Sequence, residues 1–335
     1  MRTAPASYFT LGRSGLRVSR LALGTMTFGT DWGWGADKSA ARAIFDAYVE
    51  SGGNLFDSAD LYVGGTAESW LGEFFAERKL RDKAVIATKF SFNAELGNPN
   101  AGGNGCKAML RAVEGSLGRL GTDYIDLYYI HRVDNTVPIE DTVAAMVRLK
   151  TQGKIRHLGI SEAGCETIRR AHKVHPMAAL QTEYSLWTRD VEREILPLCH
   201  DLGIGFVAYA PLGRGFLTGI VPAADALPQN DRRRDMPRFQ GTNAAHNQKL
   251  VATLKQLAAD ERCSSAQLAI AWLLSRRAAL VPLVGTSKRK WLEEDAKAVE
   301  LTPSQATLDA LDQAFMPGSA QGDRYPAAMM VRLGL

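Results

Sequence analysis

The stretch Phe56-Asp57-Ser58-Ala59-Asp60-Leu61-Tyr62 decides the fold of this chain. It directly follows an apolar run that begins at Gly53, so the carboxylate of Asp57 ends a predicted strand and the phenol of Tyr62 comes five residues later. Side chains at the carboxyl ends of parallel strands face the mouth of the sheet, where α/β enzymes carry out their chemistry. The stretch therefore predicts part of an active site.

Two later apolar runs also end in ionisable side chains. Residues 85–89 end in Lys89, and residues 125–131 end in His131. Taken singly, a charged residue or a histidine that caps a strand is more often structural than catalytic. A set of such residues at successive strand ends predicts one catalytic site instead. The set is Asp57, Tyr62, Lys89 and His131.

Short apolar runs alternate with segments of helical periodicity from Leu21 onward, which is typical of βα units. Eight strands are predicted, over residues 21–23, 54–56, 84–88, 125–130, 155–160, 179–182, 205–208 and 280–283. Strand onsets recur roughly every 25 to 40 residues, the length of a βα unit, until a gap of about 75 residues before the last one. Eight units predict an α/β fold that closes into a single (β/α)8 TIM barrel.

The segments outside these units have their own predicted forms. Residues 8–18 predict a hairpin that would close the bottom of the barrel. Residues 211–243 contain several prolines and predict a long loop after the seventh strand, and residues 317–335 predict a tail that could reach the mouth. We expect one domain over residues 1–335. Helices are predicted over 39–51, 139–152, 244–259, 265–276, 290–299 and 304–315.

The main competing architecture is a doubly wound dinucleotide-binding sheet. It would carry G-x-G-x-x-G where an early strand turns into a helix. Gly203-Ile204-Gly205 precedes a strand instead of following one, and Gly213-Arg214-Gly215 lacks the third glycine. The phosphate-binding pattern G-x-x-x-x-G-K-[ST] is also absent from the sequence. A nicotinamide cofactor would therefore be held by barrel loops.

The composition is that of a soluble globular protein, with 46% apolar and 23% charged residues among 335. A formal charge of +4 spread over the sequence gives no indication of nucleic-acid binding. The basic run at 232–234 lies between Asp231 and Asp235, where a solvated loop is expected.

The four cysteines are far apart and form neither a Cys-x-x-Cys pair nor a close Cys/His cluster, so neither a disulfide framework nor a metal site is predicted. Residues Met1 to Pro5 lack a long apolar core, and the sequence has no run of eighteen apolar residues. We expect a cytoplasmic protein without a membrane span. The cysteines are Cys106, Cys165, Cys199 and Cys263.

The chain resembles the aldo-keto reductase family at the four strand-end residues described above. The family pattern of Asp, four residues and Tyr is met by Asp57 and Tyr62, and the later Lys and His are met by Lys89 and His131. Further matches occur at 21–26, 208–213 and 285–286, so the likeness covers nearly the whole chain. The resemblance implies an oxidoreductase of the carbonyl reductase class that transfers a hydride from NADPH to an aldehyde or ketone.

The resemblance also implies a role for each member of the set. Tyr62 would donate the proton, Lys89 would lower the pKa of that phenol, and Asp57 would hold and neutralise Lys89. His131 would orient the substrate carbonyl. The structural alternative is a buried ion pair between Asp57 and Lys89 with Tyr62 at a rim.

The resemblance places the nicotinamide carboxamide at Ser161, Glu162 and Gln181. Glu162 departs from the commonest form, which has Asn, because an ionised carboxylate can only accept hydrogen bonds. Tyr209 would stack on the nicotinamide ring; alternatively it is a core aromatic. The remaining expected cofactor residues in this part are Gly24, Thr25, Met26 and Asp57.

Three consecutive cations follow the eighth strand at a predicted helix start, where backbone N–H groups favour a phosphate. Because cations are electrostatically disfavoured there, a purely structural role is less expected. They suit the 2′-phosphate of NADP. The segment comprises Gly285, Thr286, Ser287, Lys288, Arg289 and Lys290. Adenine is expected near Glu294 and Asp295, with Asp295 replacing an amide. The pyrophosphate is expected near Ala210, Pro211, Leu212, Gly213, Arg214 and Gly215.

Trp32 and Trp34 lie in the first βα loop and would line the substrate pocket with Tyr62 and His131, or pack on a neighbouring loop instead. Two other functions stay open at this point: an NADPH-binding redox-sensing or regulatory subunit with slow turnover, and an unrelated barrel isomerase or lyase. The small-molecule substrate, the direction of the reaction and the oligomeric state stay open as well.

Overall fold

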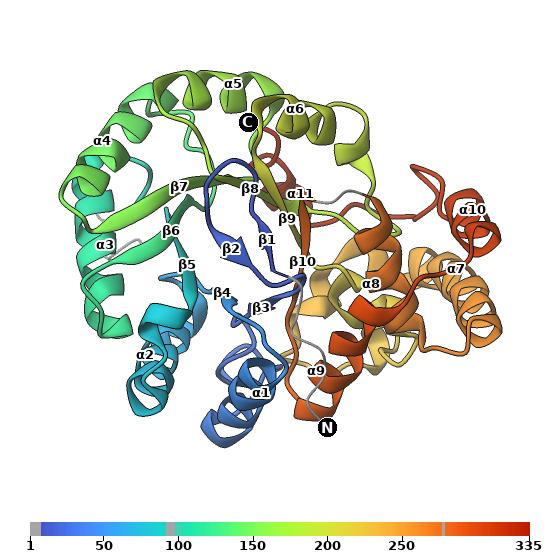
Figure 1. Cartoon of the computed structure of the whole chain (residues 1–335). Helices are drawn as coiled ribbons and strands as arrows, with labels where there is room; N and C mark the ends of the chain where they lie inside the picture. The colour runs from blue at the N-terminus through green and yellow to red at the C-terminus, as the bar shows by residue number, and fades with distance from the viewer. Residues whose placement is uncertain (1–7, 92–97, 99, 101, 277–278) are drawn as a thin grey trace.

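The computed structural model describes residues 8–91, 98, 100, 102–276 and 279–335. Eight parallel strands form a closed barrel in the order β10-β3-β4-β5-β6-β7-β8-β9 (Figure 1). The predicted (β/α)8 barrel is therefore confirmed. The strands are β3 (Ala22–Gly24), β4 (Leu55–Asp57), β5 (Val85–Phe90), β6 (Ile125–Ile130), β7 (Ile155–Ser161), β8 (Ala179–Glu183), β9 (Gly205–Tyr209) and β10 (Leu280–Val284).

Helices surround the barrel, and all of those described except the last and shortest contain buried residues. In the first, Asp37 accepts a hydrogen bond from the backbone N–H of Ala40 and so caps the helix start. Ile44 and Phe45 of that helix are fully buried, and the Phe45 ring lies 5.2 Å from the Phe56 ring of β4. The helices are α1 (Lys38–Glu50), α2 (Thr66–Arg78), α3 (Cys106–Leu120), α4 (Ile139–Thr151), α5 (Cys165–Val174), α6 (Ile195–Leu202), α7 (Gly241–Asp260), α8 (Ser265–Arg276), α9 (Arg289–Ala296), α10 (Gln305–Ala314) and α11 (Ala327–Met330).

The barrel interior is a separate apolar cluster built from every second strand residue. In β5, Val85 and Ala87 belong to this cluster, and the next residue in the same alternation is Lys89. Gly159 of β7 leaves room for a ring, because a Cβ atom there would lie 2.4 Å from the Tyr129 side chain. The interior is thus packed, and its positions nearest the carboxyl ends of the strands, such as Lys89, are polar. The cluster includes Ala22, Leu55, Leu127, Tyr129, Ala179, Val207, Val281 and Leu283.

The predicted N-terminal hairpin is confirmed as an antiparallel pair, β1 (Phe9–Thr10) and β2 (Arg17–Val18). Leu11 and Val18 are fully buried and belong to the interior cluster. Gly12 has φ +56°, and a Cβ atom there would lie 2.4 Å from the backbone nitrogen of Gly205. The hairpin therefore closes the end of the barrel where the strands begin, and it lies over the centre of the barrel in Figure 1.

The loop after β9 differs in detail from the predicted 211–243. It contains four short 3-10 turns, and α7 already begins at Gly241, ahead of the predicted 244. The turns are held by local hydrogen bonds, such as the one that the Arg233 backbone N–H donates to the Asp231 carboxylate, which periodicity does not reveal. The turns are η4 (Gly213–Thr218), η5 (Ala224–Ala226), η6 (Arg232–Asp235) and η7 (Pro237–Phe239).

Seven of the eight strands end one or two residues later than predicted, and five of the six predicted helices have shifted boundaries. β4 includes Asp57 and β5 continues past Lys89 to Phe90, because these charged side chains are paired with each other inside the barrel. α9 ends at Ala296 and is followed by the 3-10 turn η8 (Lys297–Glu300). In the sequence, Met1 to Pro5 lack a long apolar core. These residues lie outside the part of the chain that the structure describes.

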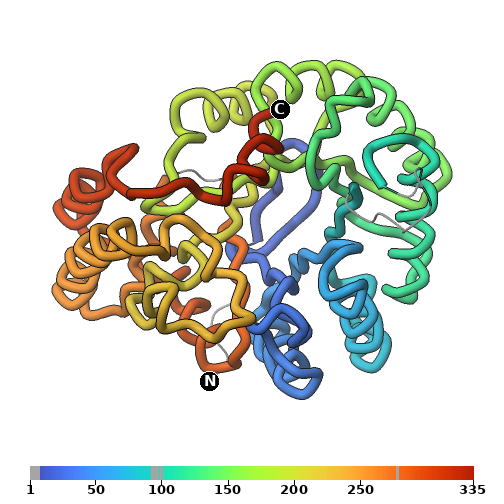
Figure 2. The backbone as a smooth tube through the Cα atoms, turned by 180° about the vertical axis from the view of Figure 1, so that it is seen from behind, coloured from blue at the N-terminus to red at the C-terminus, as the bar shows by residue number. Residues whose placement is uncertain are grey.

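The C-terminal tail returns to the barrel after α10. Figure 2, seen from behind, shows it crossing this face from α10 toward α5 and α6. The Gly334 backbone N–H donates to the carbonyl of Glu162 at 2.9 Å, and the Gly164 N–H donates to the carbonyl of Leu335 at 2.8 Å. The tail is therefore fastened to the loop that follows β7.

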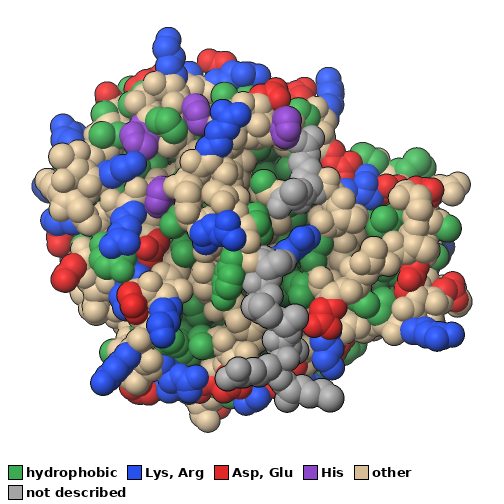
Figure 3. Space-filling model, viewed as in Figure 1, with side chains coloured by type: hydrophobic (Ala, Val, Ile, Leu, Met, Phe, Trp, Pro, Cys, Tyr) green, Lys and Arg blue, Asp and Glu red, His purple; other side chains and the backbone are tan. Residues whose placement is uncertain are grey.

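The face seen in Figure 3 carries Lys and Arg side chains interspersed with Asp and Glu side chains. Among the helices that the structure describes, none combines the length and the apolar character that crossing a membrane requires.

Candidate active site

Lys89 lies at the centre of the candidate site and is fully buried. Its ammonium group donates to a carboxylate oxygen of Asp57, to the carbonyl of Ser58 at 2.7 Å and to the hydroxyl of Tyr62 at 3.2 Å. Three acceptors therefore match the three N–H donors of the ammonium. The other carboxylate oxygen of Asp57 accepts from the Gln181 amide at 2.7 Å.

The local backbone fixes Asp57 and Tyr62. Thr25, directly after β3, donates both its N–H and its hydroxyl to the carbonyl of Asp57, at 2.9 and 3.0 Å. Tyr62 begins the short turn η1 (Tyr62–Gly65), in which Val63 has φ 49° and Gly64 has φ 62°. These left-handed residues bend the chain sharply before α2. Tyr62 is consequently turned inward and only 8% exposed.

Burial changes the acidity of these groups. Burial raises the pKa of the Tyr62 phenol, and the opposing effect of Lys89 is smaller, so the phenol is a weaker acid than the sequence predicted. Burial lowers the pKa of Lys89, but Asp57 and Tyr62 together raise it above its ordinary value. Tyr62 therefore keeps its proton, and Lys89 its charge, at neutral pH.

His131 directly follows β6, and its ring lies edge-on to the Tyr62 ring at 6.0 Å between centroids. Burial, with the charges of Arg132 and Lys89, lowers the pKa of His131 well below its ordinary value. The imidazole is therefore neutral at pH 7, and a neutral imidazole can still donate one hydrogen bond.

Arg132 is a residue of this site that the sequence analysis missed. Its guanidinium donates to the carbonyl of His131 at 2.7 Å and to the hydroxyl of Ser161 at 3.2 Å. Its charge also favours the ionised form of Tyr62. Its position directly after a strand-end histidine was the available signal.

Most of the residues expected at the nicotinamide lie at or directly after strand ends. Ser161 ends β7, Gln181 lies within β8 and Tyr209 ends β9. The residues that follow β7 and β9 are strained, since Glu162 has φ 53° and Ala210 has φ 50°. Left-handed conformations in non-glycine residues tend to occur at functional sites.

Glu162 has several internal partners. One of its carboxylate oxygens accepts from the Glu183 N–H at 2.9 Å and from the Tyr209 hydroxyl at 2.8 Å. Arg324 of the tail donates to both oxygens at 3.0 Å. The Tyr209 hydroxyl also lies 3.0 Å from the hydroxyl of Tyr325. The sequence suggested a tail near the mouth, but it gave no sign of Arg324 or Tyr325.

A second ion pair lies beside the pair of Glu162 and Arg324. Glu183 is fully buried and accepts from Arg214 at 2.8 Å, while Arg238 lies 4.0 Å away. The Arg214 guanidinium also stacks on the Tyr325 ring at 4.5 Å. The side chain of Arg214 is therefore committed within the protein, and Gly213 and Gly215 of the same turn have positive φ.

The expected phosphate segment follows β10. The Thr286 carbonyl accepts from the hydroxyl of Thr27 at 2.7 Å, which ties this segment to the loop after β3. Lys288, Arg289 and Lys290 are exposed at the start of α9. Arg289 contacts Glu293 at 2.7 Å and Glu50 at 3.6 Å, so the protein already balances part of this charge.

Asp295 and Glu294 lie on α9, where the sequence analysis expected adenine. Asp295 is 4% exposed, and burial, aided by the charge of Glu294, raises the pKa of Asp295 to about 8. Its carboxyl is therefore mostly protonated at pH 7 and can donate a hydrogen bond, as the amide that it replaces would.

The loop after β3 reaches Tyr62. Trp32 lies edge-on to the Tyr62 ring at 6.2 Å, and Arg232 lies over the Trp32 ring at 4.7 Å. Arg233 lies 5.9 Å from the Trp34 ring. Both tryptophans thus contact the neighbouring loop, while Trp32 alone of the two contacts Tyr62.

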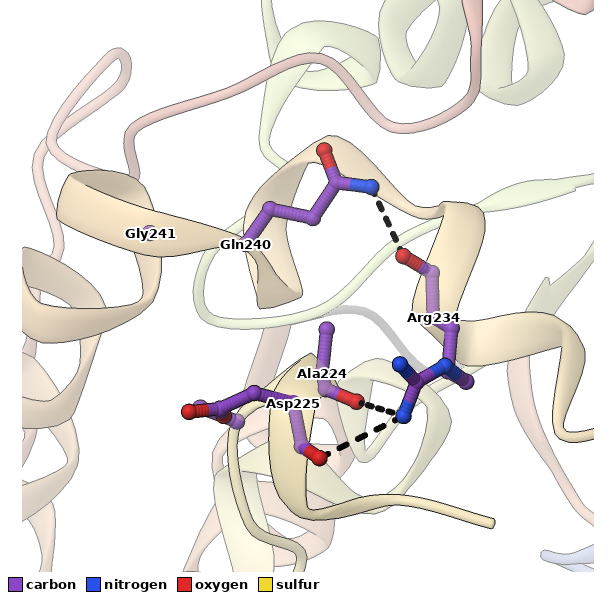
Figure 4. A pocket seen from close by; sticks show the side chains of 6 residues that line it. Ala224, Asp225, Arg234, Gln240 and Gly241 are labelled. Atoms are coloured by element: carbon purple, nitrogen blue, oxygen red, sulfur yellow. Dashed lines mark hydrogen bonds between the residues drawn. The ribbon is translucent and has the colours of Figure 1, made fainter. Parts of the chain in front are cut away.

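A hollow of about 410 Å³ lies elsewhere, between the loop after β9 and the start of α7 (Figure 4). Arg234 points across it and donates to the carbonyl of Ala224 at 2.8 Å. None of its lining residues belongs to the predicted site. They are Ala223, Ala224, Asp225, Arg234, Gln240 and Gly241.

A barrel with these ionisable residues at its carboxyl end belongs to a class with many enzymes. The sequence model of the Aldo/keto reductase family matches residues 20–315. The chain is also 39% identical over 316 residues to a Glycine max protein named "Probable aldo-keto reductase 1", covering 94% of this chain and 90% of the relative. The chain therefore belongs to the aldo/keto reductase family, which supports an oxidoreductase that acts on small carbonyl compounds.

Proposed function

We propose that this protein reduces the carbonyl group of an aldehyde or ketone to an alcohol, with NADPH as the reductant and Tyr62 as the proton donor. The observation that carries the proposal is the ammonium of Lys89, which contacts the Asp57 carboxylate and the Tyr62 hydroxyl at once. A phenol that is protonated at neutral pH and faces the mouth suits a general acid.

The reaction needs a hydride on the carbonyl carbon and a proton on the carbonyl oxygen. NADPH, when bound, supplies the hydride. Tyr62 gives its hydroxyl proton to the developing alkoxide and becomes a phenolate, which Lys89 stabilises at 3.2 Å. Asp57 keeps Lys89 in place and charged, and His131 donates the hydrogen bond that orients the carbonyl. A solvent proton then returns the phenolate to the phenol.

Donors and acceptors at the mouth fit the cofactor. Ser161 and Gln181 offer both kinds of group for the carboxamide, although the Gln181 amide nitrogen already donates to Asp57. Lys288 and Arg289 at the start of α9 favour NADPH over NADH, because a 2′-phosphate carries charge that NADH lacks. Gly24, Thr25 and Met26 would border the cofactor from β3.

Among other functions, a redox-sensing or regulatory subunit with slow turnover is the main alternative. The complete set of Asp57, Tyr62, Lys89 and His131 favours turnover instead. We expect a single domain over residues 1–335, a cytoplasmic location in keeping with four separated cysteines, and no nucleic-acid or membrane partner.

A stoichiometric NADPH titration by fluorescence, followed by a panel of aldehydes and ketones, tests this proposal. We expect saturable binding and NADPH oxidation that depends on the carbonyl compound. Tight binding with negligible turnover across the panel would favour the regulatory alternative. No fluorescence change would favour an isomerase or lyase.

A further inference from the structure

The contact between Glu162 and Arg324 joins two distant parts of the chain. The guanidinium donates to both carboxylate oxygens at 3.0 Å, and the two side chains are only 2% and 12% exposed. Two parallel hydrogen bonds fix the plane of a carboxylate as well as its position. Arg324 therefore determines which way the Glu162 carboxylate faces.

The Glu162 carboxylate also holds the Tyr209 side chain in place through a hydrogen bond. The Tyr209 hydroxyl donates to the carboxylate oxygen that also receives one Arg324 hydrogen bond, and it lies 3.0 Å from the hydroxyl of Tyr325. The Arg214 guanidinium lies over the Tyr325 ring, 4.5 Å from its centroid. The tail residues thus hold Glu162 and Tyr209 in one hydrogen-bonded unit.

The C-terminal tail also restrains the backbone of Glu162. Its φ of 53° is unfavourable for a non-glycine residue, and its carbonyl accepts from the Gly334 N–H at 2.9 Å. The tail therefore restrains both the backbone and the side chain of the residue that stands where an asparagine is usual.

We propose that Arg324 is a positioning residue for the nicotinamide end of the cofactor. By neutralising and orienting Glu162, it allows a carboxylate to stand in for the usual amide, and it keeps Tyr209 in the plane that the nicotinamide ring meets. The inference rests on the proposed function for the identity of that ligand. It implies that the tail contributes to cofactor affinity.

Removing Arg324 alone leaves the Glu162 carboxylate buried without its cation, which is costly, whereas removing both charges is much less so. Arg324→Met should therefore weaken NADPH binding about tenfold or more, and Arg324→Met with Glu162→Gln should recover most of the loss. Arg324→Lys should lie between wild type and Arg324→Met, because Lys keeps the charge without the paired donors.

The experiment measures NADPH dissociation constants by fluorescence in these variants. The same titration uses adenosine 2′,5′-bisphosphate, which lacks the nicotinamide, and melting temperatures are recorded. Arg193→Met, which removes an exposed arginine that pairs with Glu194, is the matched control. We expect Arg324→Met to weaken NADPH binding while adenosine 2′,5′-bisphosphate binding stays within about twofold of wild type.

Three results would overturn the inference. Unchanged NADPH affinity in a folded Arg324→Met variant would show that the contact does not reach the cofactor. Equal weakening of both ligands would indicate a general structural role, as would a double variant no better than Arg324→Met. A wild-type protein that binds neither ligand would instead refute the proposed function, so the two failures are distinguishable.

Discussion

The ammonium nitrogen of Lys89 lies 3.2 Å from the hydroxyl oxygen of Tyr62, and the same nitrogen is bound to the Asp57 carboxylate. Burial makes the phenol a weaker acid, while the ammonium opposes this shift. In the proposed reaction, the attraction between the Lys89 ammonium and the Tyr62 oxygen grows as Tyr62 gives up its proton and becomes negatively charged. The pair is therefore suited to stabilise charge that develops during the reaction.

Replacing Tyr62 by phenylalanine tests the proton donor. Tyr62→Phe should keep the ring beside Trp32 and His131 and leave NADPH binding nearly unchanged. Turnover should fall by roughly 100-fold or more, the usual scale for a lost general acid. Steady-state rates and a fluorescence titration check both parts, and wild-type turnover would contradict the role of Tyr62.

The pH dependence of reduction follows from the raised pKa of Tyr62 and the raised pKa of Lys89. Both groups stay protonated across neutral pH, and the low pKa of His131 keeps the imidazole neutral. We expect kcat for reduction to be flat from about pH 7 to about pH 9 when chemistry limits the rate. A fall in kcat with a midpoint near pH 7.5, measured under saturating cofactor, would be incompatible with this protonation scheme.

Lys89 and Asp57 should act as one unit. Lys89→Met removes the cation, and Asp57→Asn weakens the group that holds it, so the losses in kcat should be far from additive in the double variant. Each of the two single substitutions should reduce turnover strongly. Asp82→Asn, an exposed acid outside the site, provides the control. Losses that simply add would mean that the two residues act independently.

Cofactor choice should depend on the cations at the start of α9. Lys288→Ala and Arg289→Ala should each weaken NADPH binding by about tenfold and affect NADH much less. Because Glu293 holds Arg289 at 2.7 Å, Glu293→Gln should have the opposite effect and strengthen NADPH binding. Added salt should narrow the preference of the wild type. Equal Michaelis constants for NADPH and NADH in the unmodified protein would refute this role.

Asp295 should make the protein less stable as the pH rises. Its pKa is raised from 3.8 to about 8, so between these values the folded state binds more protons than the unfolded state. The free energy of unfolding then falls with increasing pH, by about 1.4 kcal/mol for each pH unit. Asp295→Asn should remove this dependence, and its gain in melting temperature should be larger at pH 8 than at pH 6.

A control for the last experiment is Asp309→Asn, which changes an exposed carboxylate on α10. It should shift the melting temperature little and equally at both pH values. If Asp295→Asn behaves in the same way as this control, the buried carboxyl does not carry the raised pKa.

Much of the barrel was predictable because its signals are local. Each strand repeats an apolar run, and every second residue of β5 points inward until Lys89 is reached. The same alternation leads to Asp57 in β4 and to Tyr209 in β9, so residues far apart in sequence could be expected at one mouth. Strand order follows from the βα repeat.

The remaining features depend on contacts that no local pattern contains. Arg324 meets Glu162 across 162 positions of sequence, in a tail without strong periodicity. The acidity of Tyr62 depends on burial, which follows from the packing of several elements. The turns between β9 and α7 are held by single hydrogen bonds to side chains and carbonyls, so their proline-rich sequence predicted only a loop.

The N-terminal hairpin has a consequence for the order in which the chain folds. Its own strands pair locally and can form within microseconds, but Leu11 and Val18 pack against the beginnings of strands that lie as far away as Val281. This docking surface exists only after the barrel has closed between β3 and β10. During synthesis, the hairpin leaves the ribosome well before β10 does, so this segment reaches its final place only after most of the barrel has formed.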